Sequence, residues 1–135
     1  MRVLGHGVDI VRIERFQRLV GKNPSDAYVK RLTRRIMHEV HEAPHFEALR
    51  AAGRFEKSVV YLAGTWAIKE AIYKSIDDAD QKKFQFNRWY RVYGSRGQPI
   101  VGSDVFDKNQ QFLVSVSHDG GTLIASVIRQ MKECT

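Results

Sequence analysis

Three short segments of the chain carry residues that together could act on a phosphate group. Glu70 and Lys74 are four residues apart in a helix-patterned stretch, so they share one helix face. Asp9 lies where a short strand-like run meets the next helical pattern, and His118 ends a later alternating run. Mg²⁺ takes oxygen ligands from one or two carboxylates plus substrate phosphates, and lysine supplies a point charge to a phosphate oxygen. If these residues converge, they predict a site for Mg²⁺ and a diphosphate.

Each of these residues also has a simpler explanation when it is taken alone. A glutamate four residues before a lysine, as in Glu70 and Lys74, commonly forms a surface ion pair worth a few tenths of a kcal/mol. Asp9 could simply cap a helix, and His118 could be a solvated residue at a strand end. Only their combination in one fold would support phosphate chemistry.

The hydrophobic pattern predicts one α+β domain over residues 1–135, with helices followed by antiparallel strands. Gly5 and Gly7 interrupt the first strand and indicate a close approach of its backbone to another element. A second helix would begin at Ser25 or Asp26 and end or kink at Pro44. The expected elements are a strand over 3–10, helices over 10–20, 26–43 and 56–76, a polar loop over 77–83, strands over 84–93, 100–101, 112–118 and 122–129, and turns over 95–99 and 119–121.

Composition limits the partners and the compartment. The chain has 22 Lys and Arg against 15 Asp and Glu, a net charge of +7, which suits nucleic acid, an anionic membrane, or an acidic protein or phosphate-rich ligand. Its one cysteine, Cys134, cannot form an internal disulfide. No apolar run reaches the roughly 18–20 residues of a membrane span. We therefore expect an intracellular protein, in the cytoplasm or the mitochondrial matrix.

Four motifs, in order along the chain, resemble those of the holo-[acyl-carrier-protein] synthase family of small 4'-phosphopantetheinyl transferases. The similarity extends over nearly the whole chain and is weakest over residues 21–57. Trp66, the aromatic strand and the basic balance resemble fungal mitochondrial members more than bacterial ones. The motifs are residues 5–11 with 14–16, residues 62–75, residues 97–99 and residues 115–118.

This resemblance implies an activity and a site. The enzyme would use Mg²⁺ to transfer the 4'-phosphopantetheine group from coenzyme A to a serine of apo acyl carrier protein, releasing 3',5'-ADP in support of fatty acid biosynthesis. Asp9 and Glu70 would hold the metal, and Lys74 would contact the attacked phosphate. The serine proton would go to a metal-bound water or to Glu70. The coenzyme A pocket would further include His118, Ser117, Gly97, Gln98 and Pro99.

The resemblance also implies protein partners. The carrier proteins of this family are acidic, and Arg15, with Arg12 and Arg18, would dock on that surface by charge complementarity. A solvated basic face is the alternative for any one of these arginines. Relatives of this size are often homotrimers with active sites between subunits. We expect neither a nucleic acid nor a membrane as partner.

One position departs from the family pattern. Many members carry an arginine just before the aromatic residue of the second motif, where it reaches the 3'-phosphate of coenzyme A. Here that position is Thr65. The resemblance therefore requires another cation for this contact, and Lys69 and Arg96 are candidates.

Two other functions are suggested by parts of the sequence. His41–His45 formally matches the zinc-protease pattern His-Glu-x-x-His, but Pro44 should break the helix on which that pattern depends. A basic nucleic-acid-binding module without catalysis is the other alternative, although no known nucleic-acid motif is present. The aromatic residues that invite this alternative are Phe84, Phe86, Trp89, Tyr90 and Tyr93.

Overall fold

The computed structural model of the chain describes residues 2–21 and 26–133, so Ser25 and Cys134 lie outside the described residues. Five α-helices, one short 3₁₀ helix and five strands occur in this part of the chain. Their order is β1 (Val3–Arg12), α1 (Ile13–Gly21), α2 (Asp26–Ile36), α3 (Ala43–Ala51), α4 (Phe55–Ser75), α5 (Asp78–Lys82), η1 (Phe86–Arg88), β2 (Trp89–Tyr93), β3 (Pro99–Ser103), β4 (Gln110–Asp119) and β5 (Thr122–Met131).

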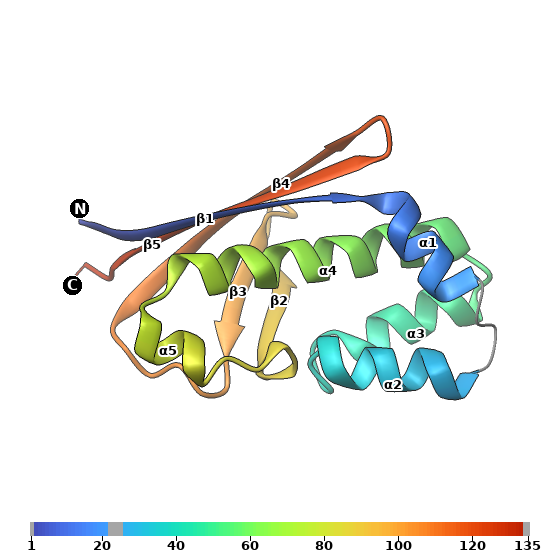
Figure 1. Cartoon of the computed structure of the whole chain (residues 1–135), viewed down its shortest axis with the longest axis horizontal. Coiled ribbons are helices and arrows are strands. Elements are labelled where there is room, and N and C mark those ends of the chain that lie inside the picture. Colours follow the sequence, from blue (N-terminus) through green and yellow to red (C-terminus); the bar gives the residue numbers. More distant parts are fainter. Residues whose placement is uncertain (1, 22–25, 134–135) are drawn as a thin grey trace.

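Three strands form the main antiparallel sheet in the order β1-β5-β4, and the β2–β3 hairpin forms a separate two-stranded sheet. Gly120 and Gly121 join β4 to β5 with φ values of 57° and 82°, a region that glycine enters at no steric cost. Figure 1 shows the tip of this hairpin projecting beyond the helices. The predicted α+β class and the predicted Gly-Gly hairpin are confirmed.

Helix α4 is the central element of the fold. It is buried on most sides, which is why its sequence is apolar almost all round. It packs on β1 and β5 and also contacts α1 and α3, and Figure 1 shows it running lengthwise across the sheet. Although α4 has 21 residues, none of the helices in the described part of the chain combines the length and apolar character needed to cross a bilayer.

The glycines of β1 bring this strand against α4. A Cβ atom added at Gly5 would collide with the carbonyl oxygen of Ser75, and one added at Gly7 would collide with that of Ala71. The close backbone approach predicted from the sequence is therefore confirmed. It places Asp9, two residues after Gly7, beside the C-terminal half of α4.

Two helix boundaries differ from the sequence prediction. Helix α1 begins at Ile13 rather than at residue 10, because β1 continues to pair with β5 until Arg12 meets Thr122. The second helix ends at Ile36, and Pro44 stands in the first turn of a separate helix, α3, that was not predicted. Proline is well suited to the first turn because its missing N–H group would have no helical partner there.

The aromatic segment before β2 also differs from the prediction. Residues 84–88 are not a strand; the short 3₁₀ helix η1 occupies Phe86–Arg88. Phe84 and Phe86 instead pack edge-to-face against each other and onto the hydrophobic core. Helix α5, Asp78–Lys82, likewise forms in the expected polar loop. Tertiary packing thus overrides the strand propensity of the aromatic residues.

Candidate functional site

Strand β1 and helix α4 bring the predicted acid and lysine residues to one place. Lys74 Nζ donates to Asp9 Oδ1 at 3.3 Å and to the Val8 carbonyl oxygen at 3.0 Å. The Asp9 side chain is only 14% exposed, and its Oδ2 is buried with no hydrogen-bond partner among the described residues. A buried polar atom without a partner is costly, so this oxygen is available to a cation or a donor from a ligand.

Glu70 faces the same centre from one helical turn before Lys74. Burial raises the pKa of the Glu70 carboxyl above its ordinary value, and the negative charge of Asp9 raises it further. The positive charges of Lys74 and Arg15 act in the opposite direction. We call Asp9, Glu70 and Lys74 the acidic centre.

The acidic centre fits Mg²⁺ by its donor set. Asp9 and Glu70 repel each other electrostatically, and a divalent cation between them would relieve that repulsion. Mg²⁺ is commonly held by one or two carboxylates, with water and substrate phosphates as its other ligands. No group of three or more metal-ligating side chains occurs in residues 2–21 and 26–133, so a metal held here would depend on such outside oxygens.

The three predicted docking arginines lie at the end of β1 and on helix α1. The Arg15 guanidinium group lies 5.2 Å from the Phe16 ring centre and 5.3 Å from that of Trp66, and its charge acts on Glu70. Arg18 forms an exposed ion pair with Glu14 one turn earlier. Arg12 is exposed at the end of β1. The three predicted docking arginines are thus all solvent-accessible, and Arg15 is electrostatically coupled to the acidic centre.

The structure does not bring His118 to the acidic centre within one chain. His118 pairs with Leu123 of β5, which pairs with Val11 of β1, so two strand spacings, or about 10 Å, separate His118 from β1. Its side chain lines a different cavity. Ser117 lies on the other face of the sheet, because neighbouring side chains of a strand alternate.

The Gly-Gln-Pro turn forms as predicted but lies in a third place. Gly97 has a φ of 78° and donates its N–H to the carbonyl oxygen of Gly94 at 2.9 Å. The Gln98 side chain accepts a hydrogen bond from the backbone N–H of Arg96 at 2.9 Å, and Pro99 begins β3. Arg96 and Gln98 line a cavity of about 670 Å³ that does not include His118.

The cavity that contains His118 is strongly basic. We call it the basic cavity; its volume is about 350 Å³, and none of its lining residues is acidic. No sequence motif links its lysine and arginines, which come from α4, from the N-terminal boundary of α4 and from β2. Its basic lining residues are Arg54, Lys57 and Arg91, together with His45 and His118.

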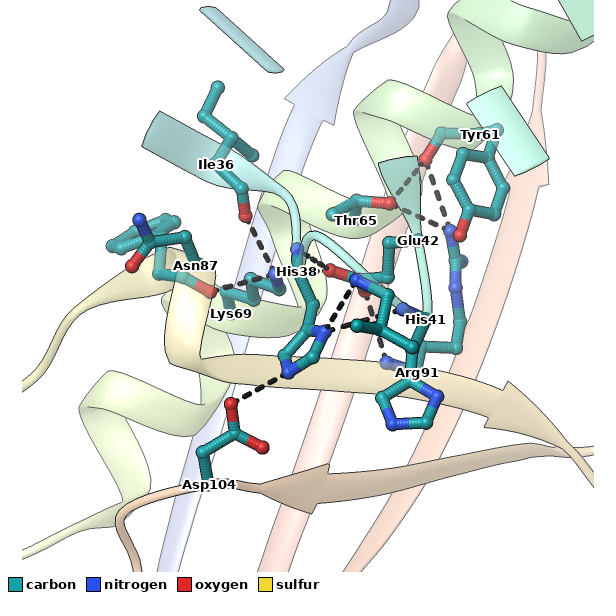
Figure 2. Close-up of polar contacts among 12 residues, drawn as sticks. Ile36, His38, His41, Glu42, Tyr61, Thr65, Lys69, Asn87, Arg91 and Asp104 are labelled. Atoms are coloured by element: carbon teal, nitrogen blue, oxygen red, sulfur yellow. Dashed lines mark hydrogen bonds and ion pairs between the residues drawn. The ribbon is translucent and has the colours of Figure 1, made fainter. Parts of the chain in front are cut away.

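Figure 2 shows a buried polar network centred on Glu42, which sequence analysis did not assign to any role. Glu42 is fully buried. Its Oε1 accepts hydrogen bonds from the backbone N–H of His38 at 2.8 Å and from Lys69 Nζ at 2.5 Å. Its Oε2 accepts one from the backbone N–H of Arg91 at 3.0 Å. One carboxylate thus connects the segment between α2 and α3, helix α4 and strand β2.

The ammonium group of Lys69 is fully engaged in this network and has no donor left for a coenzyme phosphate. Its ammonium group donates to Glu42 and to the carbonyl oxygens of Ile36 at 2.6 Å and Phe86 at 2.8 Å. The residue is 1% exposed. Burial lowers the pKa of Lys69 to about 8, with Glu42 opposing the shift. The suggestion that Lys69 replaces the missing family arginine is therefore wrong, because all three ammonium donors are used.

Thr65 has a different cation beside it. Its hydroxyl group donates to the Tyr61 carbonyl oxygen at 2.8 Å and accepts a hydrogen bond from Arg91 Nη2 at 2.8 Å. A guanidinium group from β2, 26 residues away along the chain, therefore stands next to the position where the family pattern has its arginine. Sequence analysis missed Arg91 because nothing in the local pattern links it to Thr65.

The His-Glu-x-x-His match does not form a metal site. Glu42 is buried in the polar network, and α3 begins only after it, at Ala43. His41 stacks on Tyr90 with ring centres 4.1 Å apart, whereas His45 stacks on Tyr61 at 4.6 Å. The two histidines therefore do not share the face of one continuous helix.

The aromatic residues that suggested nucleic-acid binding mostly pack inside the protein. Trp89 is 2% exposed, and its ring contacts those of Phe84, Phe106 and Phe112. Tyr93 is the member of the predicted set that is well exposed. These rings form a core cluster rather than a row of surface platforms for stacking bases.

Comparison with known proteins identifies the class to which this fold and acidic centre belong. The family model described as the 4'-phosphopantetheinyl transferase superfamily matches residues 5–128. The chain is 35% identical over 126 residues to the holo-[acyl-carrier-protein] synthase of Mycoplasma mobile, covering 93% of this chain and 89% of that protein. It therefore belongs to the 4'-phosphopantetheinyl transferase superfamily.

Further relatives place the chain among the enzymes of the holo-[acyl-carrier-protein] synthase type. The synthase of Streptococcus pyogenes serotype M28 is 30% identical over 131 residues, covering 97% of this chain and 99% of that protein. The same fold occurs in a Bacillus anthracis synthase in complex with CoA (3',5'-ADP), with TM-score 0.72, 22% identity and coverage of 96% and 98%. It also occurs in a Plasmodium yoelii synthase with ADP bound, with TM-score 0.74, 18% identity and 98% coverage of both chains. The likeness to fungal mitochondrial members stays a prediction.

Proposed function

We propose that this protein transfers the 4'-phosphopantetheine group of coenzyme A to a serine of apo acyl carrier protein, with Mg²⁺, and releases 3',5'-ADP. The observation that carries the proposal is the acidic centre. There the buried Asp9 Oδ2 has no hydrogen-bond partner among residues 2–21 and 26–133, and the charge of Asp9 raises the pKa of Glu70. The curated relatives are holo-[acyl-carrier-protein] synthases. Residues 1–135 would act as one domain.

The residues of the acidic centre have separate roles in this proposal. Asp9 and Glu70 would hold Mg²⁺, which supplies charge stabilisation and orientation to the coenzyme A diphosphate. Lys74 is half exposed beside Asp9 and would contact the phosphate that receives the attack. Phosphoryl transfer depends mainly on such positioning and charge stabilisation.

The reaction forms one P–O bond and breaks another. The carrier serine oxygen attacks the phosphorus nearest the pantetheine, and the bond from that phosphorus to the oxygen bridging it to the nucleotide breaks. Glu70 is our candidate for taking the serine proton, because its carboxylate belongs to the acidic centre that would hold the reacting diphosphate.

Helix α1 would dock the acidic carrier protein. Arg12, Arg15 and Arg18 are exposed, and charge complementarity steers an acidic partner toward them. Arg15 is the arginine of this set whose charge acts on the Glu70 carboxyl. A carrier bound to Arg15 would therefore have its serine close to the acidic centre. This arrangement requires no nucleic acid or membrane.

The face of the main sheet away from α4 supports the proposal of a homotrimer. Val8 and Ile10 of β1, Leu113 of β4 and Ile124 of β5 are between 39% and 64% exposed. The strand alternation places them on the side that α4 does not cover. Contact between copies through this face would bury apolar area and allow His118, Ser117 and the turn at Gly97, Gln98 and Pro99 to act on coenzyme A held by a neighbouring acidic centre.

Intact-mass analysis tests the proposed function. Apo acyl carrier protein is incubated with this protein, coenzyme A and Mg²⁺, with an EDTA control. We expect a mass gain equal to one phosphopantetheine group that EDTA abolishes. No gain with several apo carriers would contradict the proposal. Steeply salt-dependent binding to generic DNA without coenzyme A binding would favour the nucleic-acid alternative instead.

The cellular setting is a further part of the proposal. Transfer of phosphopantetheine to an acyl carrier protein would support fatty acid biosynthesis, in the cytoplasm or the mitochondrial matrix. The single cysteine of the sequence fits a compartment in which folding does not depend on disulfides. Depletion of the protein should lower the ratio of holo to apo carrier in that compartment, as measured by mass spectrometry of the carrier.

A further inference from the structure

The basic cavity is built to receive an anion. It lies among α3, the first half of α4, strand β2 and the ends of β4 and β5. Arg54, Lys57 and Arg91 line it together with two histidines, and no carboxylate is among the lining residues. Because the lining contains no acidic side chain, no lining residue neutralises the positive charge of the cavity.

Arg91 is the buried cation of this cavity. The residue is 7% exposed. Its guanidinium group donates from Nη2 to the Tyr61 carbonyl oxygen at 3.1 Å and to the Thr65 hydroxyl group at 2.8 Å. Nε is buried with no partner in the described part of the chain, and no carboxylate there hydrogen-bonds the group. A buried guanidinium without a counter-charge is costly unless a ligand supplies one.

The surroundings of Arg91 hold its guanidinium group in one orientation. The group lies 4.3 Å from the ring centre of Tyr61. Its Nη1 is 3.0 Å from the point where a Cβ at position 64 would stand, so Gly64 leaves room for it in the middle of α4. Burial raises the pKa of Tyr61 to about 12, and the phenol therefore keeps its proton and can donate.

We propose that Arg91 is a specificity-determining residue that binds the 3'-phosphate of coenzyme A in the basic cavity. This inference rests on the proposed function. A guanidinium group that is oriented by packing and that no carboxylate of the cavity lining neutralises suits a phosphate, to which arginine donates charge-assisted hydrogen bonds.

The acidic centre and the basic cavity differ in chemistry, and this difference indicates which phosphate of coenzyme A each would bind. The diphosphate needs a metal, and the carboxylates that can hold one are Asp9 and Glu70. The basic cavity has cations and donors but no lining carboxylate, which suits a phosphomonoester of charge about −1.5 to −2 at neutral pH. The 3'-phosphate is the monoester of coenzyme A.

The test compares coenzyme A with dephospho-coenzyme A, which lacks only the 3'-phosphate. Transfer to one apo carrier is measured with both substrates for the wild type and for Arg91→Lys. We expect the preference for coenzyme A to fall by roughly 10- to 100-fold in Arg91→Lys, the range for loss of a charge-assisted hydrogen bond. The loss should appear in KM for coenzyme A, because the 3'-phosphate takes no part in the chemical step.

Two further variants separate recognition from folding. Gly64→Ala keeps Arg91 but places a methyl group against its Nη1, so it should reduce the preference in the same direction while alanine favours the helix. Arg88→Lys changes an exposed arginine of η1 and should leave the preference at the wild-type value. Thermal unfolding of each variant confirms that it is folded.

Calorimetric binding of 3',5'-ADP and of 5'-ADP provides a readout without catalysis. We expect the wild type to bind 3',5'-ADP more tightly and Arg91→Lys to lose that difference. An equal loss for both substrates in a folded Arg91→Lys variant, or equal binding of the two nucleotides by the wild type, would overturn the inference. Absence of transfer by the wild type from either substrate, with 3',5'-ADP still preferred, would contradict the proposed function and leave the role of Arg91 supported.

Discussion

Two lysines of helix α4, five residues apart, each pair with a carboxylate from another part of the chain, and the two pairs have opposite surroundings. Lys74 and Asp9 form an open pair, with Nζ and Oδ1 3.3 Å apart and the Lys74 side chain 49% exposed. Lys69 and Glu42 form a closed pair, 2.5 Å apart, with side chains 2% and 0% exposed. Lys69 therefore belongs to the buried network, whereas Glu70, the next residue along the helix, belongs to the acidic centre.

The difference between the pairs shows where chemistry is available. In the closed pair every ammonium donor of Lys69 has a protein acceptor, and Glu42 accepts three hydrogen bonds. In the open pair Asp9 Oδ2 has no partner in the described part of the chain. The neighbouring Glu70 carboxyl, which completes the acidic centre, has a raised pKa. A satisfied buried network stabilises the fold, whereas an unsatisfied one is ready to bind a cation.

The largest expected effect is a loss of activity on substitution of Glu70 in the acidic centre. Glu70→Gln removes one of the two carboxylates proposed to hold the metal, without changing the shape of the side chain. We expect transfer to fall by at least about 10⁴-fold, roughly 5.4 kcal/mol of transition-state stabilisation. The melting temperature should stay the same or rise, because a repulsion with Asp9 is removed. A folded Glu70→Gln enzyme with near-normal activity would show that the acidic centre is not the metal site.

The next largest expected effect is a loss of stability on substitution of Glu42 in the closed pair. Glu42→Ala leaves the buried Lys69 ammonium group without its counter-charge, and we expect the free energy of unfolding to fall by about 3–5 kcal/mol. Urea denaturation measures it. A Glu42→Ala, Lys69→Met double variant removes both charges and should recover part of the loss. A loss under about 1 kcal/mol in Glu42→Ala, the usual range for an exposed pair, would mean that the two pairs do not differ as described.

The pH dependence of activity sharpens the comparison. Glu70 must be ionised to hold a metal, so at Mg²⁺ concentrations well below saturation activity should fall as pH falls through the raised pKa of metal-free Glu70, above the ordinary glutamate value near 4.3. Stability should move in the opposite direction: a carboxyl whose pKa is raised on folding binds its proton more tightly in the folded state, so acidification through that pKa stabilises the protein.

Two measurements on the same samples check this opposition. Rate profiles of the wild type at Mg²⁺ concentrations well below saturation give the acid limb of the pH dependence. Melting temperatures of the wild type and Glu70→Gln without Mg²⁺, over the same pH range, give the stability change. An acid limb at the ordinary glutamate value, or identical pH dependence of the two melting curves, would contradict the environment assigned to Glu70.

The smallest expected effect is on carrier association when Arg15, whose charge acts on Glu70, is substituted. Arg15→Glu should lower the association rate of the acidic carrier by roughly tenfold at low salt, with a weaker effect at high salt. Stopped-flow binding at several ionic strengths measures it. Lys30→Glu, the same charge change on the exposed face of α2, is the matched control. Equal effects of the two substitutions would mean that only net charge matters and that α1 is not the docking surface.

Sequence patterns located most of the elements but not all of their limits. The period of the apolar residues predicted α4, and the alternation around Asp119–Gly121 predicted the β4–β5 hairpin, because both signals are local. Helix α3 was missed because Pro44 was interpreted as a stop, although proline also fits the first turn of a helix. Residues 84–88 were predicted as a strand because aromatic residues favour strands, whereas here they fill the core.

The sequence by itself determined the α+β class, the family resemblance and the shared helix face of Glu70 and Lys74. These follow from residue types at short spacings on single elements. Only the tertiary structure decided that Lys69 is buried against Glu42 and that Arg91, from a strand far along the chain, stands beside Thr65. Burial and partner choice depend on how distant elements pack, and a charged residue looks the same in the sequence whether its partner is water, a carboxylate or a ligand.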